Sequence, residues 1–384
     1  MKVAFITTIA HNVGDDFVRD GIAYLLRQAI GPFESRLVHK HFPVTARPGA
    51  ERMHLNPLVR TLRGVRGLRG DRLSRWLDAL PLPKHGDAIL DCDLLVQSGA
   101  PVYWLNADGA CQNNEWYGPL IRRRWQQRQT RAPLLNIGAG ACQPFHSDGS
   151  EFAAAPGALR YIREFFEQCA LTTLRDALSE RILTQAGLAA PRLPCPSLYA
   201  RCWHGIQTAA GDYVALNFMG KGGHYDLDGA ADFERWRLTF SEVLRSLSQH
   251  ERCVLVCHDH EEEKLAAQLF PEVERFHATD AAQYLRFYAN ARSGILNRVH
   301  GAFALASFGR PAVIIGADSR ARMGEEIGLS VFPVSTATTQ EILAAHAEMR
   351  LREVTVAERM ADLTAETERR YLRLLRDATP HCRS

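Results

Sequence analysis

The sequence lacks the cysteine spacing of a disulfide-rich or zinc-binding protein. Its nine cysteines are odd in number and scattered along the chain, and no Cys-x-x-Cys pair occurs. Cys253 and Cys257 lie close to His258 and His260, but both cysteines fall within one expected strand. Four residues of extended chain separate two side chains by about 13 Å, which is too far for a shared metal ion. The pattern therefore favours free thiols in a reducing compartment and no metal site.

Long apolar segments and a strong charge bias are also missing. No apolar run approaches the ~20 residues that a membrane-spanning helix needs. The first apolar run, Val3 to Ala10, is short, contains two threonines and continues into a polar turn, unlike a secretory signal peptide. The formal net charge is only +3, so bulk charge indicates no nucleic-acid partner. We therefore predict a cytoplasmic protein.

Strands and helices alternate along almost the whole chain of 384 residues, which is long for one core and sufficient for two domains. Short apolar runs followed by amphipathic segments predict parallel sheets covered by helices. We expect an N-terminal α/β domain over 1–190, a proline-stiffened linker over 191–201 and a C-terminal α/β domain over 202–354. A charged amphipathic helix within 355–384 is expected to pack back on the N-terminal domain.

One strand–helix–strand unit carries the most informative polar residues. The pattern predicts a strand over 294–296, a helix over 302–308 that Gly309 ends, and a second strand over 312–315. The second strand is an uninterrupted apolar run, as a covered parallel sheet requires.

Four basic side chains fall at the carboxyl ends of these two strands. Arg298 and His300 lie at the turn where the helix begins, and Arg320 and Arg322 follow the second strand. A helix N-terminus at this edge of a parallel sheet offers free N–H groups and the positive end of a dipole. The arrangement indicates a site for a small, multiply charged anion beside a proton donor.

This unit resembles the C-terminal signature of the polysaccharide pyruvyl transferase family. The specific part is Arg298-Val-His300-Gly301, then a small-residue helix, Gly309-x-Pro311 and Arg320 about twenty residues after the histidine. Weaker landmarks follow earlier strands in the family's order: Asn12-Val-Gly14-Asp15, Ser98-Gly99-Ala, Gly138-Ala-Gly140 and Arg175-Asp176-x-x-Ser179. Two positions depart from the family pattern, because Arg320 stands where lysine is common and Cys195 where aspartate is usual.

The resemblance implies an α/β fold of two Rossmann-like domains that face each other across a cleft, the GT-B-like architecture. It implies a phosphoenolpyruvate-dependent transferase, which moves the pyruvyl group to hydroxyls of a sugar in a cell-surface polysaccharide or lipid-linked glycan precursor and forms a ketal. Phosphoenolpyruvate is then the donor substrate, and no cofactor is required. The acceptor would bind the N-terminal domain and the anionic donor the C-terminal one.

The resemblance and the chemistry together assign roles to single residues. We expect His300 to be the general acid, because imidazole titrates near neutral pH, and Asp15 to align or deprotonate the acceptor. Arg298, Arg175 and Arg320 suit a carboxylate and a phosphate, which guanidinium groups bind bidentately. The other residues expected to contact substrate are Asn12, Gly14, Ser98, Gly99, Gly138, Gly140, His258 and Gly301.

Several of these residues also have an ordinary structural explanation. Asn12 and Asp15 are suited to cap the first helix, and Arg175 could pair with Asp176 or Glu180. Four aromatic residues suit either a buried core or stacking on a sugar ring: Tyr103, Trp104, Trp116 and Tyr117.

A basic stretch over about 58–76 has no counterpart elsewhere in the chain. Arginines recur at every third position, with glycines between them: Arg60, Arg63, Arg66, Arg69, Arg72 and Arg75. At 100° per residue an α-helix would not align them on one face, and the glycines weaken a helix. Two interpretations remain, a solvated loop or an insertion that contacts an anionic membrane surface.

Two other functions are compatible with the same architecture. A glycosyltransferase with a nucleotide-sugar donor would need a carboxylate for the ribose hydroxyls, and Glu325 or Glu326 could provide it. A non-catalytic scaffold in glycan assembly would keep the fold without binding any small anion.

Overall fold

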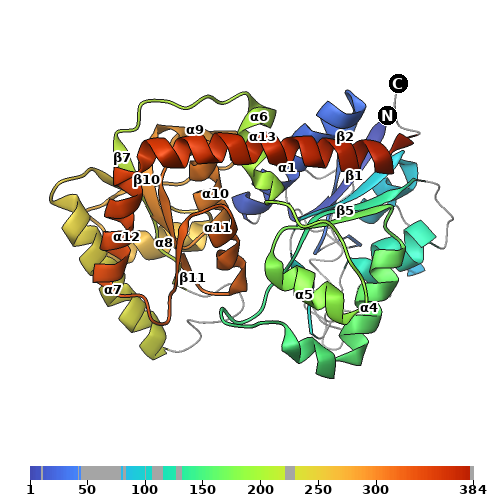
Figure 1. Cartoon of the computed structure of the whole chain (residues 1–384), viewed down its shortest axis with the longest axis horizontal. Helices are drawn as coiled ribbons and strands as arrows, with labels where there is room; N and C mark the ends of the chain where they lie inside the picture. The colour runs from blue at the N-terminus through green and yellow to red at the C-terminus, as the bar shows by residue number, and fades with distance from the viewer. Residues whose placement is uncertain are drawn as a thin grey trace.

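The computed structural model describes residues 1–9, 12–41, 43–44, 79–80, 84–99, 101–105, 116–126, 132–220 and 230–380. The basic stretch 58–76, and with it the expected membrane contact of Arg60–Arg75, lies outside the described residues. The described chain forms two α/β halves, and one long C-terminal helix lies along both of them (Figure 1).

The N-terminal half is built on a six-stranded sheet in the order β2-β1-β3-β5-β4, with β6 also paired to β5. All strand pairs are parallel. Every residue of β3 and β5 is buried, as expected for a sheet covered on both faces. The strands are β1 (Lys2–Thr7), β2 (Glu34–His39), β3 (Leu94–Ser98), β4 (Pro101–Tyr103), β5 (Leu134–Ala141) and β6 (Leu171–Leu174).

Helices of this half connect the strands and cover the sheet. The first, α1, begins after the N-cap Asn12, whose side chain accepts a hydrogen bond from the Gly14 N–H at 3.0 Å. The helical segments are α1 (Val13–Ile30), η1 (His85–Asp91), η3 (Tyr117–Gln126), η4 (Ser150–Ala154), α4 (Pro156–Glu167) and α5 (Ala177–Gln185).

The C-terminal half has a second six-stranded sheet in the order β12-β11-β10-β7-β8-β9, again parallel throughout. Its strands are β7 (Tyr213–Asn217), β8 (Cys253–Val256), β9 (Glu274–Phe276), β10 (Ala291–Leu296), β11 (Ala312–Gly316) and β12 (Ser330–Pro333). Its helical segments are α7 (Ala230–Ser248), α8 (His260–Leu269), α9 (Ala281–Asn290), α10 (Val299–Ser307), η6 (Ser319–Arg322), α11 (Met323–Glu326) and α12 (Thr339–Leu351).

The proline-rich segment 191–201, expected to be the linker, is packed against the N-terminal half. It forms η5 (Pro196–Tyr199) and the start of α6 (Ala200–His204). A Cβ on Gly21 of α1 would lie only 1.8 Å from the carbonyl oxygen of Pro196, so helix and segment are in close contact. The chain then crosses to β7 after α6.

The C-terminal helix α13 (Glu353–Ala378) contacts both halves. Tyr24 in α1 donates a hydrogen bond to Glu368 at 3.0 Å, and Tyr371 donates one to the Pro194 carbonyl at 3.1 Å. At the other end, a Cβ on Gly309 would lie 3.0 Å from Ala357. The two halves share one apolar core, in which the ring centres of Phe17 and Tyr288 are 6.4 Å apart.

Two parallel-sheet α/β domains are thus present, and the predicted fold class is confirmed. Among the described helices, none combines the length and the apolar character that crossing a bilayer requires.

Candidate active site between the two domains

His300 lies in the first turn of α10, directly after β10, and its imidazole faces the N-terminal domain. Its Nε2 atom is 3.4 Å from Nη1 of Arg175 and 3.8 Å from Sγ of Cys195. On the other side of the ring, a Cβ on Gly14 would lie 2.8 Å from Nδ1. The side chain therefore lies between the domains.

The contact with Arg175 also determines which ring nitrogen of His300 carries the proton. A guanidinium group only donates hydrogen bonds, so Nε2 must accept from Arg175. In the neutral ring the proton is then on Nδ1, the nitrogen beside Gly14. Burial lowers the pKa of His300 well below its usual range, and Arg175, Arg320, His258 and Arg298 lower it further. Without a ligand the imidazole is neutral at pH 7.

Arg175 reaches this place from the carboxyl end of β6. Its side chain is buried, and its Nε atom has no hydrogen-bond partner among the described residues. A Cβ on Gly140 would lie 2.6 Å from that Nε, so only glycine leaves room for the guanidinium. The alternative partner Glu180 pairs with Arg192 at 3.0 Å, while Asp176 caps α5. Arg175 is thus aimed at His300.

Arg298 is held by carboxylates from α8. Its Nε donates to Glu262 at 2.6 Å and its Nη2 to Asp259 at 2.7 Å. Asn217 at the end of β7 accepts from the Arg298 backbone N–H at 2.9 Å and donates to Glu262 at 3.0 Å. Burial opposes the charge, but Glu262 and Asp259 outweigh it, so the pKa of Arg298 is raised. This network orients Arg298 at the sheet edge.

Arg320 is held in a similar way by Asp318, the N-cap of η6. Its Nε and Nη2 atoms lie 2.8 and 2.5 Å from the two carboxylate oxygens. Burial opposes the charge of Arg320, while Asp318 and, more weakly, Asp15 raise its pKa. Among the described residues, the Nη1 groups of Arg298 and Arg320 donate to no protein acceptor.

The carboxylates change the electrostatic prediction made from the sequence. Three arginines surround His300, but Asp259, Asp318 and Glu262 offset much of their charge. Burial raises the pKa of Glu262, although Arg298 opposes this shift. A ligand would therefore be recognised by directed N–H groups more than by an excess of positive charge.

A small cavity of about 40 Å³ lies beside Arg298, His300 and Arg320, whereas Arg175 does not line it. It is lined by Asn12 and Gly14 from the N-terminal domain and, from the C-terminal domain, by residues that include His258, Arg298, His300 and Arg320. The volume suffices for about three water molecules, whereas pockets for small molecules typically measure about 300–1,000 Å³. A donor molecule would have to widen the cavity.

Hydrogen bonds also cross the domain boundary outside the cavity. Glu326 of α11 accepts from the Ala177 N–H at the start of α5 at 2.8 Å and from Arg192 at 2.6 Å. Ser319 and Gln143 exchange two hydrogen bonds of 2.9 and 3.0 Å. We refer to these residues (Glu326, Ala177, Arg192, Ser319 and Gln143) as the interdomain latch.

Arg322, expected beside Arg320 on the same rim, points elsewhere. Its Nη1 donates to the Ser147 carbonyl of the N-terminal domain at 3.0 Å, and Arg322 does not line the cavity. Asp15 lies in the first turn of α1 next to Gly14 but does not line the cavity either. A catalytic role for Asp15 stays a prediction.

The remaining expected contacts have packing roles in this structure. A Cβ on Gly99 would lie 2.2 Å from Val18, and one on Gly138 would lie 2.9 Å from Pro196. Ser98 is buried, and its hydroxyl has no partner among the described residues. None of these residues lines the cavity. Their direct contact with a ligand stays a prediction.

The aromatic set belongs to the core of the N-terminal domain. Tyr103, Trp104, Trp116 and Tyr117 are all buried. The rings of Trp116 and Tyr117 meet Phe165 edge to face at 5.2 and 5.6 Å. Stacking on a sugar is therefore not needed to explain them.

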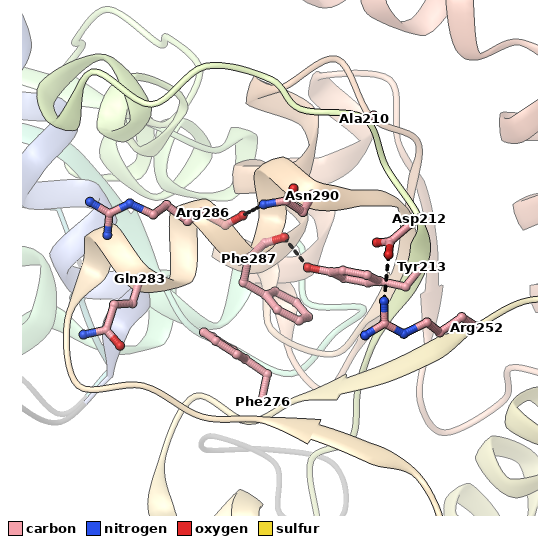
Figure 2. Close-up of a pocket in the computed structure, with 9 residues that line it drawn as sticks. All are labelled: Ala210, Asp212, Tyr213, Arg252, Phe276, Gln283, Arg286, Phe287 and Asn290. Carbon is pink, nitrogen blue, oxygen red and sulfur yellow. Dashed lines mark hydrogen bonds and ion pairs between the residues drawn. The ribbon is translucent and has the colours of Figure 1, made fainter.

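A second, larger hollow of about 590 Å³ lies beside α9 and the start of β7 (Figure 2). The charge of Arg252 is paired there with Asp212 at 2.7 Å, and the Tyr213 hydroxyl donates to the Phe287 carbonyl at 2.6 Å (Figure 2). None of the residues predicted to bind substrate lines this hollow. Its exposed Arg286 provides a useful control for substitutions at the site.

Sequence reasoning missed the carboxylates that hold the arginines. Asp259 and Glu262 have the spacing of an ordinary helix start, with an N-cap and an acidic third residue. Asp318 likewise resembles a simple cap. Asp259 and Glu262 meet Arg298 because β8 and β10 flank the same strand, β7, although they are distant in the sequence, so no local signal identifies this pairing. Asp318 is only two residues from Arg320, so that pair could have been considered from the sequence.

Comparison with known proteins identifies the family of the chain. The family model for polysaccharide pyruvyl transferase matches residues 12–319. The chain belongs to this family of transferases. A search of curated protein sequences gives no match.

Solved structures resemble the whole chain in fold. The S. aureus MnaA–UDP structure has a TM-score of 0.54 and 11% identity and covers 94% of this chain and 91% of its own. The UDP-GlcNAc 2-epimerase of Methanocaldococcus jannaschii, in complex with UDP-GlcNAc and UDP, gives a TM-score of 0.51 and 12% identity, covering 91% and 93%. At such identities the similarity shows the shared GT-B-like fold alone.

Proposed function

We propose that the protein transfers the pyruvyl group of phosphoenolpyruvate to two hydroxyls of a sugar in a cell-surface polysaccharide or glycan precursor, forming a ketal. The observation that carries the proposal is the position of His300. It contacts Arg175 of the N-terminal domain, and it lines the same cavity as Arg298 and Arg320 of the C-terminal domain. Family membership supports the reaction class.

The arginines suit the two anionic groups of the donor. Phosphoenolpyruvate carries a carboxylate and a phosphate, and planar guanidinium groups can bind each bidentately. The Nη1 groups of Arg298 and Arg320, together with the unpartnered Nε of Arg175, are the donors that protein acceptors leave unused among the described residues. Arg298 and Arg320 line the cavity, whereas Arg175 contacts it through His300.

His300 would supply the proton that starts the reaction. Protonation of the methylene carbon of phosphoenolpyruvate makes the adjacent carbon electrophilic, and a sugar hydroxyl attacks it and releases its proton. The bond from this carbon to the phosphate oxygen then breaks, and the second hydroxyl attacks the same carbon. Its proton passes to the departing phosphate, which leaves as inorganic phosphate, and the ketal is complete. The bound anion raises the pKa of His300, which allows the neutral ring to take up the proton it donates.

The N-terminus of α1 would form the acceptor side of the site. Asp15 and Asn12 are placed at the N-terminus of α1, next to the cavity wall formed by Gly14. In the proposed reaction Asp15 aligns or deprotonates the attacking hydroxyl. No cofactor or metal takes part in the proposed reaction.

We place the reaction in the cytoplasm. The seven cysteines within the described residues are all free, which suits a reducing compartment. A lipid-linked acceptor would bring the enzyme to the membrane surface, where the stretch 58–76 could contact anionic lipids.

One observation favours this function over the nucleotide-sugar alternative. Glu326, which would hold ribose hydroxyls, is already bound to Ala177 and Arg192 in the interdomain latch. Glu325 beside it is exposed to solvent and does not line the cavity.

The decisive experiment incubates the purified protein with phosphoenolpyruvate and a panel of glycan precursors. We expect release of inorganic phosphate together with the mass gain of one pyruvyl ketal. His300→Gln should lower the rate by about 10²–10⁴-fold, the usual contribution of a general acid. The matched control is His250→Gln, because His250 is exposed and precedes the amino end of β8, whereas the site lies at the carboxyl ends of the strands.

Each outcome has a clear consequence. Unchanged turnover in His300→Gln would show that His300 is not the acid. Protection from thermal unfolding by UDP-sugars and not by phosphoenolpyruvate would favour a glycosyltransferase, since a ligand stabilises the state that it binds. Lack of protection by any small anion would favour a scaffold.

A further inference from the structure

His258 is a second histidine at the candidate active site, beside His300 in the lining of the cavity. It follows β8, its side chain is buried, and it lines the same cavity. Its backbone N–H donates to Glu262 at 2.8 Å, so the network that holds Arg298 also holds this residue. Burial and the charge of Arg298 lower the pKa of His258 well below its usual range, so the ring is neutral and carries a single N–H.

One ring nitrogen of His258 has a short hydrogen bond, and the other has no hydrogen-bond partner among the described residues. Nε2 lies 2.6 Å from the hydroxyl of Tyr288, which is fully buried in α9. Nδ1 is buried and has no hydrogen-bond partner among the described residues. An unused buried donor or acceptor is costly, so this atom requires an explanation.

The hydroxyl of Tyr288 decides where the proton lies. Burial raises the pKa of Tyr288 well above its usual value, so the O–H is kept. His258 Nε2 is its only hydrogen-bond partner among the described residues. If the hydroxyl donates to Nε2, the proton of the neutral ring is on Nδ1. The Tyr288 O–H then has Nε2 as its acceptor, and the Nδ1–H of His258 finds one as soon as an acceptor enters the cavity. If the proton were on Nε2 instead, the buried Tyr288 O–H would have no acceptor, with or without a ligand.

Gly301 shows that this contact is built into the packing. A Cβ at this position would lie 2.4 Å from the Tyr288 hydroxyl oxygen and 3.4 Å from Cε1 of His258. The glycine that follows His300 therefore makes room for the tyrosine hydroxyl, and contact of Gly301 with the substrate is not needed to explain it.

We propose that His258 donates a hydrogen bond through Nδ1–H to an oxygen of the bound anion, and that Tyr288 is the positioning residue that holds His258 in this tautomer. The proposal rests on the proposed function, because it names a further recognition group of that same anion site. His258 would thus be a neutral hydrogen-bond donor beside the arginines, which orients the bound anion without adding positive charge to the site.

The tautomer can be measured without any substrate. In protein labelled with ¹⁵N-histidine, the two ring nitrogens have different chemical shifts in the two neutral tautomers, and His258→Asn identifies the signals by their loss. We expect Nδ1–H in the natural protein and a mixture of tautomers in Tyr288→Phe, which removes only the hydroxyl. A predominant Nε2–H form in the natural protein would overturn the proposal.

Binding tests the donor role with a matched pair of variants. The amide nitrogen of asparagine can take the place of Nδ1, whereas that of glutamine extends to the place of Nε2. We expect His258→Asn to bind phosphoenolpyruvate within about fivefold of the natural protein and His258→Gln to bind it about 10- to 100-fold more weakly, the usual loss of a hydrogen bond to a charged group. Equal affinities of both variants would overturn the donor role.

Failure of the proposed function would be visible separately. If phosphoenolpyruvate does not bind the natural protein, the proposed donor is wrong, and inorganic phosphate then serves as the probe. A shift of the His258 Nδ1 signal on addition of phosphate would still support the anion contact, whereas no shift with either probe would refute it. Thermal unfolding of each variant distinguishes lost binding from lost folding.

Discussion

Binding of phosphoenolpyruvate should be accompanied by proton uptake at His300. In the protein without ligand, burial, Arg175, Arg320, His258 and Arg298 all lower the pKa of this imidazole. An anion placed among the three guanidinium groups opposes their effect. If His300 is the general acid, the complex must contain the imidazolium form that the free protein does not.

The size of the effect follows from simple electrostatics. A unit charge about 4 Å from the ring contributes about 4 kcal/mol at an effective dielectric constant of about 20, which equals about three pKa units. The donor carries more than one negative charge, so its binding raises the pKa of His300 back toward the ordinary value of imidazole. We therefore expect uptake of up to about one proton for each molecule bound at pH 7.

The sign of the pH dependence is also determined. The pKa of His300 is low in the free protein and higher in the complex, so binding strengthens as the pH falls between these two values, by up to about tenfold per pH unit. Below the pKa of His300 in the free protein, the imidazole is protonated with and without ligand; above its pKa in the complex, it is protonated in neither. Outside this range, His300 therefore makes no contribution to the pH dependence of binding.

Isothermal titration calorimetry in buffers with different ionisation enthalpies measures the number of protons taken up. The phosphate of the ligand titrates in the same range, so the quantity of interest is the difference between the natural protein and His300→Gln. Arg286→Ala, in the hollow beside α9, should behave like the natural protein. Equal proton uptake with and without His300 would refute both the protonation and the acid role.

Two substitutions test the packing around the site. Gly14→Ala places a Cβ 2.8 Å from Nδ1 of His300. Overpacking should lower the free energy of unfolding by about 1–3 kcal/mol, partly offset by a gain in helix propensity of about 1 kcal/mol. Because the imidazole is displaced, calorimetry should show about tenfold weaker binding of phosphoenolpyruvate. Gly118→Ala, whose nearest neighbour would be 3.6 Å away, is the control, and equal affinity of both variants would contradict the geometry. Glu326→Ala removes the acceptor for Ala177 N–H and should lower the free energy of unfolding by about 1–2 kcal/mol, measured by denaturant titration. The exposed Glu325→Ala should have no such effect, and equal losses in the two variants would argue against the interdomain latch.

The local structure of the site was accessible from the sequence because it depends on neighbouring residues. An apolar strand, a polar turn and a helix of small residues predict a sheet edge near Leu296, and β10 and α10 lie there. The position of Arg298 and His300 at this turn depends on the local sequence and not on contacts with distant parts of the chain. Two alternating α/β halves and the family resemblance likewise predict the GT-B-like fold, which the comparisons confirm.

What only the tertiary structure decides is which groups meet across the sheets and between the domains. His300 is neutral and holds its proton on Nδ1 because Arg175, distant in the sequence, donates to Nε2. Arg298 is oriented and partly neutralised because Glu262 lies on a helix that follows a different strand. Sequence alone determined which side chains stand at the edge of the sheet, because periodicity and turn residues act locally. Their charge, their tautomers and their access to a ligand depend on long-range neighbours, and folding alone brings these together.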